Sequence, residues 1–574
     1  MNDDILYSIN YHEMTKHSES SVMNSNYYLD WSNRPKPFKV YKDLSSFPLP
    51  IDFPLPTLNA IAAVGNLSSN NESFDNKTQF AFPSPSKEDV SKIITLSDLS
   101  SILFYSCGIT RTMRFNSVNY YMRAASATGA LYPIETYVVT KGLGSELHAG
   151  VYHFNPGEFS LTAIHKGDYR NLIGSIAGNN INVTTSPISL IFTSYAWRNA
   201  WKYQSRSYRH WFWDAGVIVS NLLAVTGSMH LKPRLIMGFL DDQSNRFLGL
   251  EDEKEASILI AAIDVNPLKN NANQEQYTMQ DTMQEQLLQE KVLDSPAPKV
   301  YPLSLEEIDY PEIWKAYASS KLSDRSQLFR WINHKRSEAA DELDKKDNSN
   351  PSILKQYSLP KSFVEINGPN IGNTILKRGS TRQFSRLSIS FLTLSNILLN
   401  STRGIPMDYK NDSDSFIDLY LVVNSVDGLE KGGYFFNPRN NSIDLLKYSP
   451  GHDISGHLCL DQSLFANASV VIFIMTNLKH VLTVLGNRGY RTVQMEAGII
   501  AGKIYLLSYA SGLGASGSTF YDNEVIEFFS PHAKQKETLI AIGVGIPSYQ
   551  SKPGRVLPVR LSREQMIKAS SMGS

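Results

Sequence analysis

Short apolar runs rich in β-branched and aromatic residues alternate with longer helical stretches along most of the chain. The runs Glu135–Val139, Ser189–Phe192 and Ile258–Val265 have the length and composition of β-strands. The stretch from Tyr208 to Gly227 predicts a long helix, and another helix is expected to begin at residues 95–99 with a Thr or Ser side chain as its N-cap. Strands that alternate with helices favour an α/β or an α+β fold.

The same pattern occurs twice in the chain. Three blocks of sequence recur 282 residues later (206 to 488 and 214 to 496): Arg206–Arg209 as Arg488–Arg491, Asp214–Gly216 as Glu496–Gly498, and Gly150–Pro156 as Gly432–Pro438. Three collinear blocks at one spacing indicate a duplicated domain, because the period is far too long for a solenoid repeat. We expect the functional site at the seam between the two copies.

The duplication divides the 574 residues into four segments. Residues 1–66 are rich in Pro, Asn and Ser and predict an extended N-terminal arm. The first domain spans 67–268. A polar stretch predicts a helical connector over 269–365, with one helix expected at Gln274–Leu293. The second domain spans 366–574.

Composition excludes several classes of protein. Because 55 Lys and Arg balance 55 Asp and Glu, no net charge favours nucleic acid or an anionic membrane. Cys107 and Cys459 are too far apart for a disulfide framework or a CxxC site, and His452 and His457 are too isolated to bind a metal. No signal peptide or membrane-length apolar run is visible, so we expect a cytoplasmic protein.

The second copy carries a basic, hydroxyl-rich segment, Lys377–Arg382, shortly before its first helix. Two guanidinium groups and two hydroxyls within five residues suit a phosphate, because Arg binds phosphate with a bidentate fork. The first copy has Phe80–Ser84 at the aligned position and lacks the basic groups. The second copy also has a glycine-rich segment, Gly512–Gly517, expected as a turn that a flat ligand can approach, and it adds Lys552 and Arg555 after its last strand.

The first copy keeps a different set of residues. Its segment Arg123–Pro133 has nothing in common with the matching stretch Asp412–Phe416. The triplet Trp201-Lys202-Tyr203 stands where the second copy has Thr483-Val484-Leu485. Burial beside a ligand would lower the pKa of the Lys202 amine towards that of a useful general base. Asp214 and Glu496, by contrast, lie on corresponding helices and are interpreted as structural.

Together these segments resemble a known family. The segment Arg378–Arg382 resembles the FMN-phosphate motif of the nitroreductase superfamily. The segment Arg123–Pro133 resembles the PSAGALYP segment of its SagB-type (ThcOx-like) azoline dehydrogenases, which make azoles in peptide natural products. In the arm, Tyr11–Ser18 and Pro35–Lys39 resemble the amino-terminal signature of that group. The resemblance covers nearly the whole chain and is weakest in the connector.

The resemblance implies an α+β fold of two tandem nitroreductase-like domains, each with a central, mostly antiparallel sheet and flanking helices, that form a pseudo-dimer within the chain. It implies one FMN per chain, since only one of the two symmetry-related sites keeps both halves of its motif set. The residues expected to bind this cofactor come from both copies: Ser126, Thr128 and Gly129 from the first, and Arg378, Ser380, Arg382, Gly514, Ser516, Gly517, Lys552 and Arg555 from the second. Ala127 departs from the family, whose members often carry Ser there.

Lys202 and Tyr203 match the position of a Lys-Tyr pair implicated in catalysis by azoline dehydrogenases. The implied reaction removes a proton and a hydride from adjacent carbons of a thiazoline or oxazoline ring, with Lys202 as the base, Tyr203 assisting or orienting it, and the flavin accepting the hydride. The implied partner is a peptide, either ribosomal or bound to a carrier protein. From the charge balance, the isolated histidines and the short apolar runs we expect no metal, nucleic acid or membrane partner. A further homodimer stays open.

Two other functions stay open on the sequence. A nitro- or quinone-reducing flavoprotein of the same fold would use a nicotinamide and would have no need of the Lys-Tyr pair. A non-catalytic scaffold subunit of a biosynthetic complex would leave the motif set idle, and the purified protein would be colourless.

Overall fold

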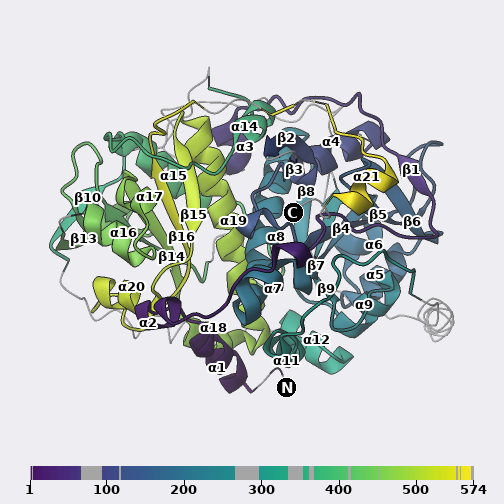
Figure 1. The fold of residues 1–574 in the computed structure, drawn as a ribbon, viewed down its shortest axis with the longest axis horizontal. Helices are drawn as coiled ribbons and strands as arrows, with labels where there is room; N and C mark the ends of the chain where they lie inside the picture. Colours follow the sequence, from purple (N-terminus) through teal and green to yellow (C-terminus); the bar gives the residue numbers. More distant parts are fainter. Residues whose placement is uncertain are drawn as a thin grey trace.

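A computed structural model describes the fold. The residues that it describes are 2, 4–65, 93–115, 118–264, 297–333, 353–360, 368–410, 415–449, 451–550, 554–555 and 557–569. The helix expected at Gln274–Leu293 and the expected cofactor ligand Lys552 lie outside this part of the chain. Two seven-stranded antiparallel sheets, each with flanking helices, lie on either side of a central helix pair (Figure 1). This arrangement confirms the predicted α+β fold of two tandem units, each with a central antiparallel sheet and flanking helices.

The first half holds a sheet with the strand order β1-β6-β5-β4-β7-β9-β8. Its strands are β1 (Ser46–Pro48), β4 (Ile134–Thr140), β5 (Gly150–Asn155), β6 (Ser160–Lys166), β7 (Ile188–Tyr195), β8 (Lys232–Ile236) and β9 (Glu255–Asp264). Its helices are α4 (Leu96–Cys107), α5 (Arg170–Ile176), α6 (Ile181–Thr185), α7 (Ala196–Tyr203), α8 (Ser207–Ser228) and α9 (Asp241–Leu248). A separate hairpin of β2 (Ile109–Phe115) and β3 (Val118–Arg123) precedes the one-turn 3-10 helix η3 (Thr128–Ala130).

The second half repeats this order as β10-β13-β12-β11-β14-β16-β15. Its strands are β10 (Lys355–Ser358), β11 (Asp418–Val423), β12 (Gly432–Asn437), β13 (Ser442–Tyr448), β14 (Val470–Thr476), β15 (Gly514–Ser518) and β16 (Glu537–Gly545). Its helices are α14 (Ile371–Lys377), α15 (Phe391–Ser401), α16 (His452–Leu458), α17 (Ser463–Ala466), α18 (Leu478–Leu485), α19 (Arg488–Ala510) and α20 (Asp522–Phe529). The offset of 282 residues also separates β8 from β15 (232 to 514) and α7 from α18 (196 to 478), so the sequence repeat is a structural repeat.

Local sequence accounts for several of these elements. The helix predicted near residue 95 is α4, and Thr95 caps it in a capping box with Asp98, as expected. Strands β7 and β14 are buried along their whole length, which explains their continuous apolar character. Strands predicted over 135–139, 189–192 and 258–265 correspond to β4, β7 and β9.

The segments outside the two repeats pack onto them. The N-terminal segment, expected to be extended, carries two helices and a 3-10 turn before β1 joins the first sheet: α1 (Leu6–Met14), α2 (Glu19–Met23) and η1 (Trp31–Asn33), followed further on by α3 (Ala60–Gly65). The described part of the connector contains α11 (Pro311–Ser320) and α12 (Arg325–Asn333). At the other end of the chain, α21 (Arg563–Lys568) crosses back to the first half, where Met566 packs against Gly157 and Phe38 (Figure 1).

The seam between the halves is formed by α8 and α19, which lie side by side at the centre of the molecule (Figure 1). They meet at equivalent glycines. A Cβ atom on Gly216 would lie 2.6 Å from the carbonyl carbon of Gly498, and one on Gly498 would lie 2.7 Å from the Trp213 carbonyl oxygen. Glycine at both positions therefore allows the two helix backbones to touch.

Buried ion pairs cross the seam in both directions. Two arginines of each half bind one aspartate of the other: Arg206 and Arg209 bind Asp522 at 3.2 Å, and Arg488 and Arg491 bind Asp241 at 2.6 Å. All six side chains are almost fully buried. Removal of either aspartate would leave buried cations without compensation, which makes each half dependent on the other.

Candidate functional site

The Lys202–Tyr203 pair ends helix α7 of the first half. The site loop, defined here as residues 124–132, lies against this pair. A Cβ atom on Gly129 would lie 2.9 Å from the Tyr203 hydroxyl oxygen and 3.4 Å from Lys202 Cδ, and Gly129 has a φ of +62°. Glycine suits this position for two reasons: it adopts the left-handed backbone conformation readily, and it leaves room for the side chains of Lys202 and Tyr203. Three of the residues predicted for the site are brought together here.

Asp214 of α8 holds the site loop in place. Its Oδ1 accepts hydrogen bonds from the Thr128 amide at 2.8 Å and from Thr128 Oγ1 at 2.7 Å, while its Oδ2 accepts one from Asn199 Nδ2 at 3.1 Å. No cation partners this carboxylate among the residues described, and burial raises its pKa to about 6. The residue interpreted as structural from the sequence thus positions the predicted cofactor ligand Thr128.

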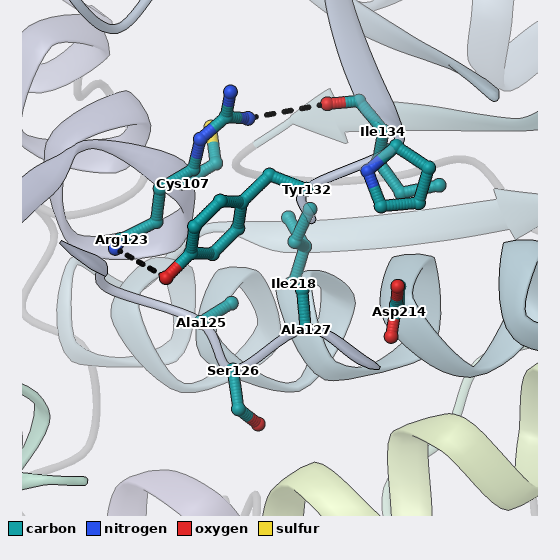
Figure 2. Close-up of a pocket in the computed structure, with 10 residues that line it drawn as sticks. Cys107, Arg123, Ala125, Ser126, Ala127, Tyr132, Ile134, Asp214 and Ile218 are labelled. Carbon is teal, nitrogen blue, oxygen red and sulfur yellow. Dashed lines mark hydrogen bonds between the residues drawn. The ribbon is translucent and has the colours of Figure 1, made fainter. Parts of the chain in front are cut away.

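Ser126 and Ala127 line a small hollow of about 10 Å³ between the site loop and α8 (Figure 2). Tyr132 forms one wall of it, and its hydroxyl accepts a hydrogen bond from the Arg123 amide at 3.2 Å. This volume is room for about one water molecule. It is far below the roughly 300–1,000 Å³ of sites that hold a drug-sized ligand. The hollow lies between the site loop and α8 and is too small to hold a cofactor.

Arg378 of the second half reaches across the seam to the same loop. It follows the last residue of α14, and its guanidinium donates to the Ala124 carbonyl at 3.0 Å and to the Arg123 carbonyl at 3.1 Å. Burial lowers its pKa. The basic segment found only in the second copy therefore contacts the loop found only in the first. This contact is needed for the expected single site built from residues of both copies.

The rest of the basic segment faces β15 and α19. Ser380 Oγ lies 3.5 Å from the Tyr505 hydroxyl, and the Thr381 amide donates to the Ala515 carbonyl at 2.9 Å. The backbone amide of Arg382 donates to the Tyr549 hydroxyl at 3.1 Å, while its side chain is exposed. The Arg382 guanidinium is thus available to an anion.

The glycine-rich segment predicted as a turn is the edge strand β15, so this prediction is wrong. Gly514, Ser516 and Gly517 pair with β16 in regular antiparallel register, and the turn lies before them, at Gly512 with a φ of +75°. Glycine composition favours a turn, but pairing within the sheet overrides that preference. The lack of a side chain on Gly514 still has a use, because a Cβ there would lie 2.1 Å from Thr381 Oγ1.

Arg555 lies near the C-terminal end of α14. Its amide donates to the Thr110 carbonyl at 2.7 Å, and the preceding Gly554 amide donates to the Leu376 carbonyl at 2.7 Å. The Arg555 side chain is exposed. Leu376 directly precedes the basic segment, so the backbone of Arg555 lies near that segment. No contact of the Arg555 side chain with Arg378 or Arg382 is present in the described structure.

Two cations from other parts of the chain act on Lys202 at this site. Burial lowers the pKa of Lys202, and the positive charges of Arg34 from the arm and Arg382 from the second half lower it further. None of the three forms an ion pair with a carboxylate of the described residues. An uncompensated positive region suits a ligand that carries phosphate or carboxylate.

The two symmetry-related ends of the seam differ. In one, the edge of β8 is covered by the other half: the Leu235 amide donates to the Pro406 carbonyl and the Asp408 amide donates to the Leu235 carbonyl, both at 2.9 Å. In the other, the equivalent amide, that of Gly517, donates to the Tyr505 hydroxyl at 2.6 Å. In the described chain the site loop forms no such bridge to β15. The end with Lys202 is therefore the more open one.

Sequence reasoning missed Arg34, Tyr505 and the anchoring role of Asp214. Each acts through a contact with a residue far away in the chain, so no local pattern marks it. The available signal for Arg34 was its place in the arm signature, one residue before Pro35.

No helix of the described chain is long and apolar enough to cross a membrane, and no group of three or more His, Cys, Asp or Glu side chains in that part of the protein is arranged to bind a metal.

Comparisons with known proteins place the fold and the family. No family model matches the chain. A crystal structure from Anabaena variabilis, described as a nitroreductase, has a TM-score of 0.70 at 22% identity and covers 94% of this chain and 99% of its own. A chain of the E. coli microcin synthetase complex with truncated pro-MccB17 is also similar, but its TM-score of 0.27 at 17% identity, over 46% of this chain and 93% of its own, is too low to carry an argument.

A protein of Methanocaldococcus jannaschii that is named as a nitroreductase is 32% identical over 176 residues, which are 29% of this chain and 88% of that protein. Because nearly all of that relative is matched at this level of identity, the chain belongs to the nitroreductase family.

Proposed function

We propose that the protein is an FMN-dependent oxidase that converts thiazoline or oxazoline rings of a peptide into thiazoles or oxazoles. One observation carries this proposal. Lys202 and Tyr203 of the first half contact the site loop at Gly129, and the charge of Arg382 from the second half acts on Lys202. A candidate base and a candidate phosphate ligand, which lie on different halves, thus share one site.

The residues present fit FMN. The exposed Arg382 guanidinium and the Ser380 hydroxyl suit the phosphate, and the backbone of β15 at Gly517 carries no side chain that would obstruct a flat ring. The opposite end of the seam lacks this opening, because Pro406 and Asp408 cover the edge of β8. We therefore propose one FMN per chain. When bound, FMN supplies the capacity to accept a hydride.

Lys202 removes the ring proton in this proposal. A general base must be neutral at the working pH, and burial together with two nearby cations lowers the pKa of Lys202 towards that condition. Burial raises the pKa of Tyr203, so its hydroxyl stays protonated and can donate a hydrogen bond that orients the substrate or the lysine. Gly129 leaves room for that hydroxyl, since a Cβ there would lie 2.9 Å from it.

The proposed test uses the purified protein, a synthetic thiazoline peptide and dioxygen, with formation of the thiazole followed by its absorbance and mass. Lys202→Met should lower kcat by about 100-fold or more, which is the usual contribution of a general base. Lys479→Met is the matched control, because Lys479 is an exposed lysine of α18, the counterpart of α7.

The same preparation discriminates among the functions. Thiazole formation that requires Lys202 supports the azoline oxidase. Nicotinamide-dependent reduction of a nitroarene or quinone that is unaffected by Lys202→Met, without thiazole formation, would contradict it and support the reductase. Protein that holds no flavin even after addition of FMN would support a scaffold.

A further inference from the structure

A second, larger hollow opens beside the catalytic pair. Its volume is about 80 Å³, which is room for several water molecules, and it lies between the arm, strand β3 and the far end of the site loop. Its walls include the rings of Trp31, Tyr120, Tyr121 and Tyr132. Ala130 also lines it and directly follows Gly129, the residue of the site loop that closely approaches the catalytic pair.

Arg34 is the one charged residue among those that line this hollow. Its guanidinium lies 5.2 Å from the ring centre of Tyr120 and 6.0 Å from that of Trp31. The guanidinium forms no hydrogen bond or ion pair with the described chain, yet it is close enough to Lys202 for its charge to lower the pKa of that amine. Aromatic faces hold the cation in one region and leave its N–H groups to a ligand.

The arm holds Arg34 at a fixed place relative to Lys202. Trp31 packs edge-on against Trp201, with 5.4 Å between ring centres, and Trp201 immediately precedes Lys202. The indole N–H of Trp201 donates to the Asp30 carbonyl at 2.9 Å, and the Asp30 carboxylate caps the turn that leads to Arg34. A ligand bound by Arg34 is therefore positioned with respect to the base.

We propose that this hollow binds the part of the peptide next to the ring being oxidised, and that Arg34 recognises a carboxylate on that part. The inference rests on the proposed oxidase function and specifies its substrate. A guanidinium binds a carboxylate through two parallel hydrogen bonds, and the aromatic walls accept a flat azole or a nonpolar side chain. The carboxylate is either the C-terminus of the peptide or an Asp or Glu side chain beside the ring.

Binding of thiazole peptides, which are products and are not turned over, tests the inference without catalysis. Four short peptides are compared by titration calorimetry on the flavin-loaded protein: one with a C-terminal thiazole carboxylate, its carboxamide, and two with an internal thiazole followed by Asp or by Asn. We expect roughly tenfold tighter binding of one acid than of its neutral partner, because a hydrogen bond to a charged group is worth more than one to a neutral group. Whichever pair shows the difference identifies the source of the carboxylate.

Arg34→Gln should reduce this tenfold preference to about one, and Arg34→Lys should keep part of it, since it retains the charge and loses the bidentate geometry. Arg114→Gln is the matched control, because Arg114 is an exposed arginine of the β2–β3 hairpin, which borders the hollow, but does not itself line the hollow. Flavin content should stay unchanged in all three variants, which verifies that they fold.

Equal binding of acid and neutral peptides by the unmodified protein, or a preference that survives Arg34→Gln, would overturn the inference. Turnover of the matching thiazoline peptides is measured separately. A carboxylate preference without any thiazoline oxidation would contradict the proposed oxidase function and not the recognition by Arg34, so the two failures are distinguishable.

Discussion

The rings of Tyr208 and Tyr490 stack across the seam with 6.4 Å between their centres and 3° between their planes, although 282 residues separate them in the chain. Tyr11 of the arm packs edge-on against both. The two tyrosines lie near the start of α8 and α19, so the pseudo-twofold relation between the halves is visible in single side chains. A covalent link lets the two ends of such a seam diverge, and only one of them is open here.

The close contact of α8 and α19 predicts intolerance of any side chain at the crossing. Gly216→Ala should lower the free energy of unfolding by roughly 1–3 kcal/mol, because its Cβ would meet the backbone of Gly498 at 2.6 Å. Gly227→Ala, on the same helix, is the control: its Cβ would lie 3.7 Å from the Ala63 carbonyl oxygen, so the better helix propensity of Ala should leave stability equal or higher. Urea unfolding measures both, and equal effects would contradict the close packing.

Asp214 predicts a pH dependence of stability. Burial raises its pKa from 3.8 to about 6, so its contribution to stability is fully present below about pH 3.8 and is lost as the pH rises through 6. When the pH is lowered from 7.5 to 5, the free energy of unfolding of the unmodified protein should rise by about 1 kcal/mol relative to that of Asp214→Asn. Unfolding of both proteins at the two pH values measures this difference. The same difference at both pH values would show that the carboxylate titrates normally.

Lys202 predicts the pH profile of catalysis. If it is the base, kcat should rise with pH and level off below the ordinary lysine pKa of 10.5, since burial, Arg34 and Arg382 lower its pKa. Arg34→Gln removes one of these charges and should shift the midpoint to higher pH. The profile is measured with a neutral carboxamide substrate at saturating FMN, so that carboxylate binding does not enter. A midpoint that stays in place would argue against Lys202 as the titrating group.

Much of the fold could be predicted from the sequence because the duplication preserved spacing. The repeat of the Arg206 and Asp214 blocks implied equivalent helices, and α8 with α19 carries them. Strand β15 could not be predicted in this way. Its glycines favour a turn locally. Its conformation is decided by the pairing with β16, whose partner residues lie 23 to 31 positions further on (518 to 541 and 514 to 545).

The site could be predicted in part, for a similar reason. The segments around Lys202 and Arg378 are compact, so their chemistry is visible in a few adjacent residues. Arg34 acts on Lys202 from 168 positions away (34 to 202), and Asp214 holds Thr128 from 86 positions away. Such partners are set by packing of the whole chain, which no short motif contains.

The count of FMN per chain tests the composite site most directly. The flavin is released from the purified protein, identified, and divided by the protein concentration. We predict one FMN per chain, and no bound flavin in the double variant Arg378→Ala, Arg382→Ala. The control Arg386→Ala should still bind it, because Arg386 lies four residues after Arg382 (382 to 386) and its side chain donates to Asn467 instead. Two FMN per chain, or none after FMN is added, would contradict the single composite site.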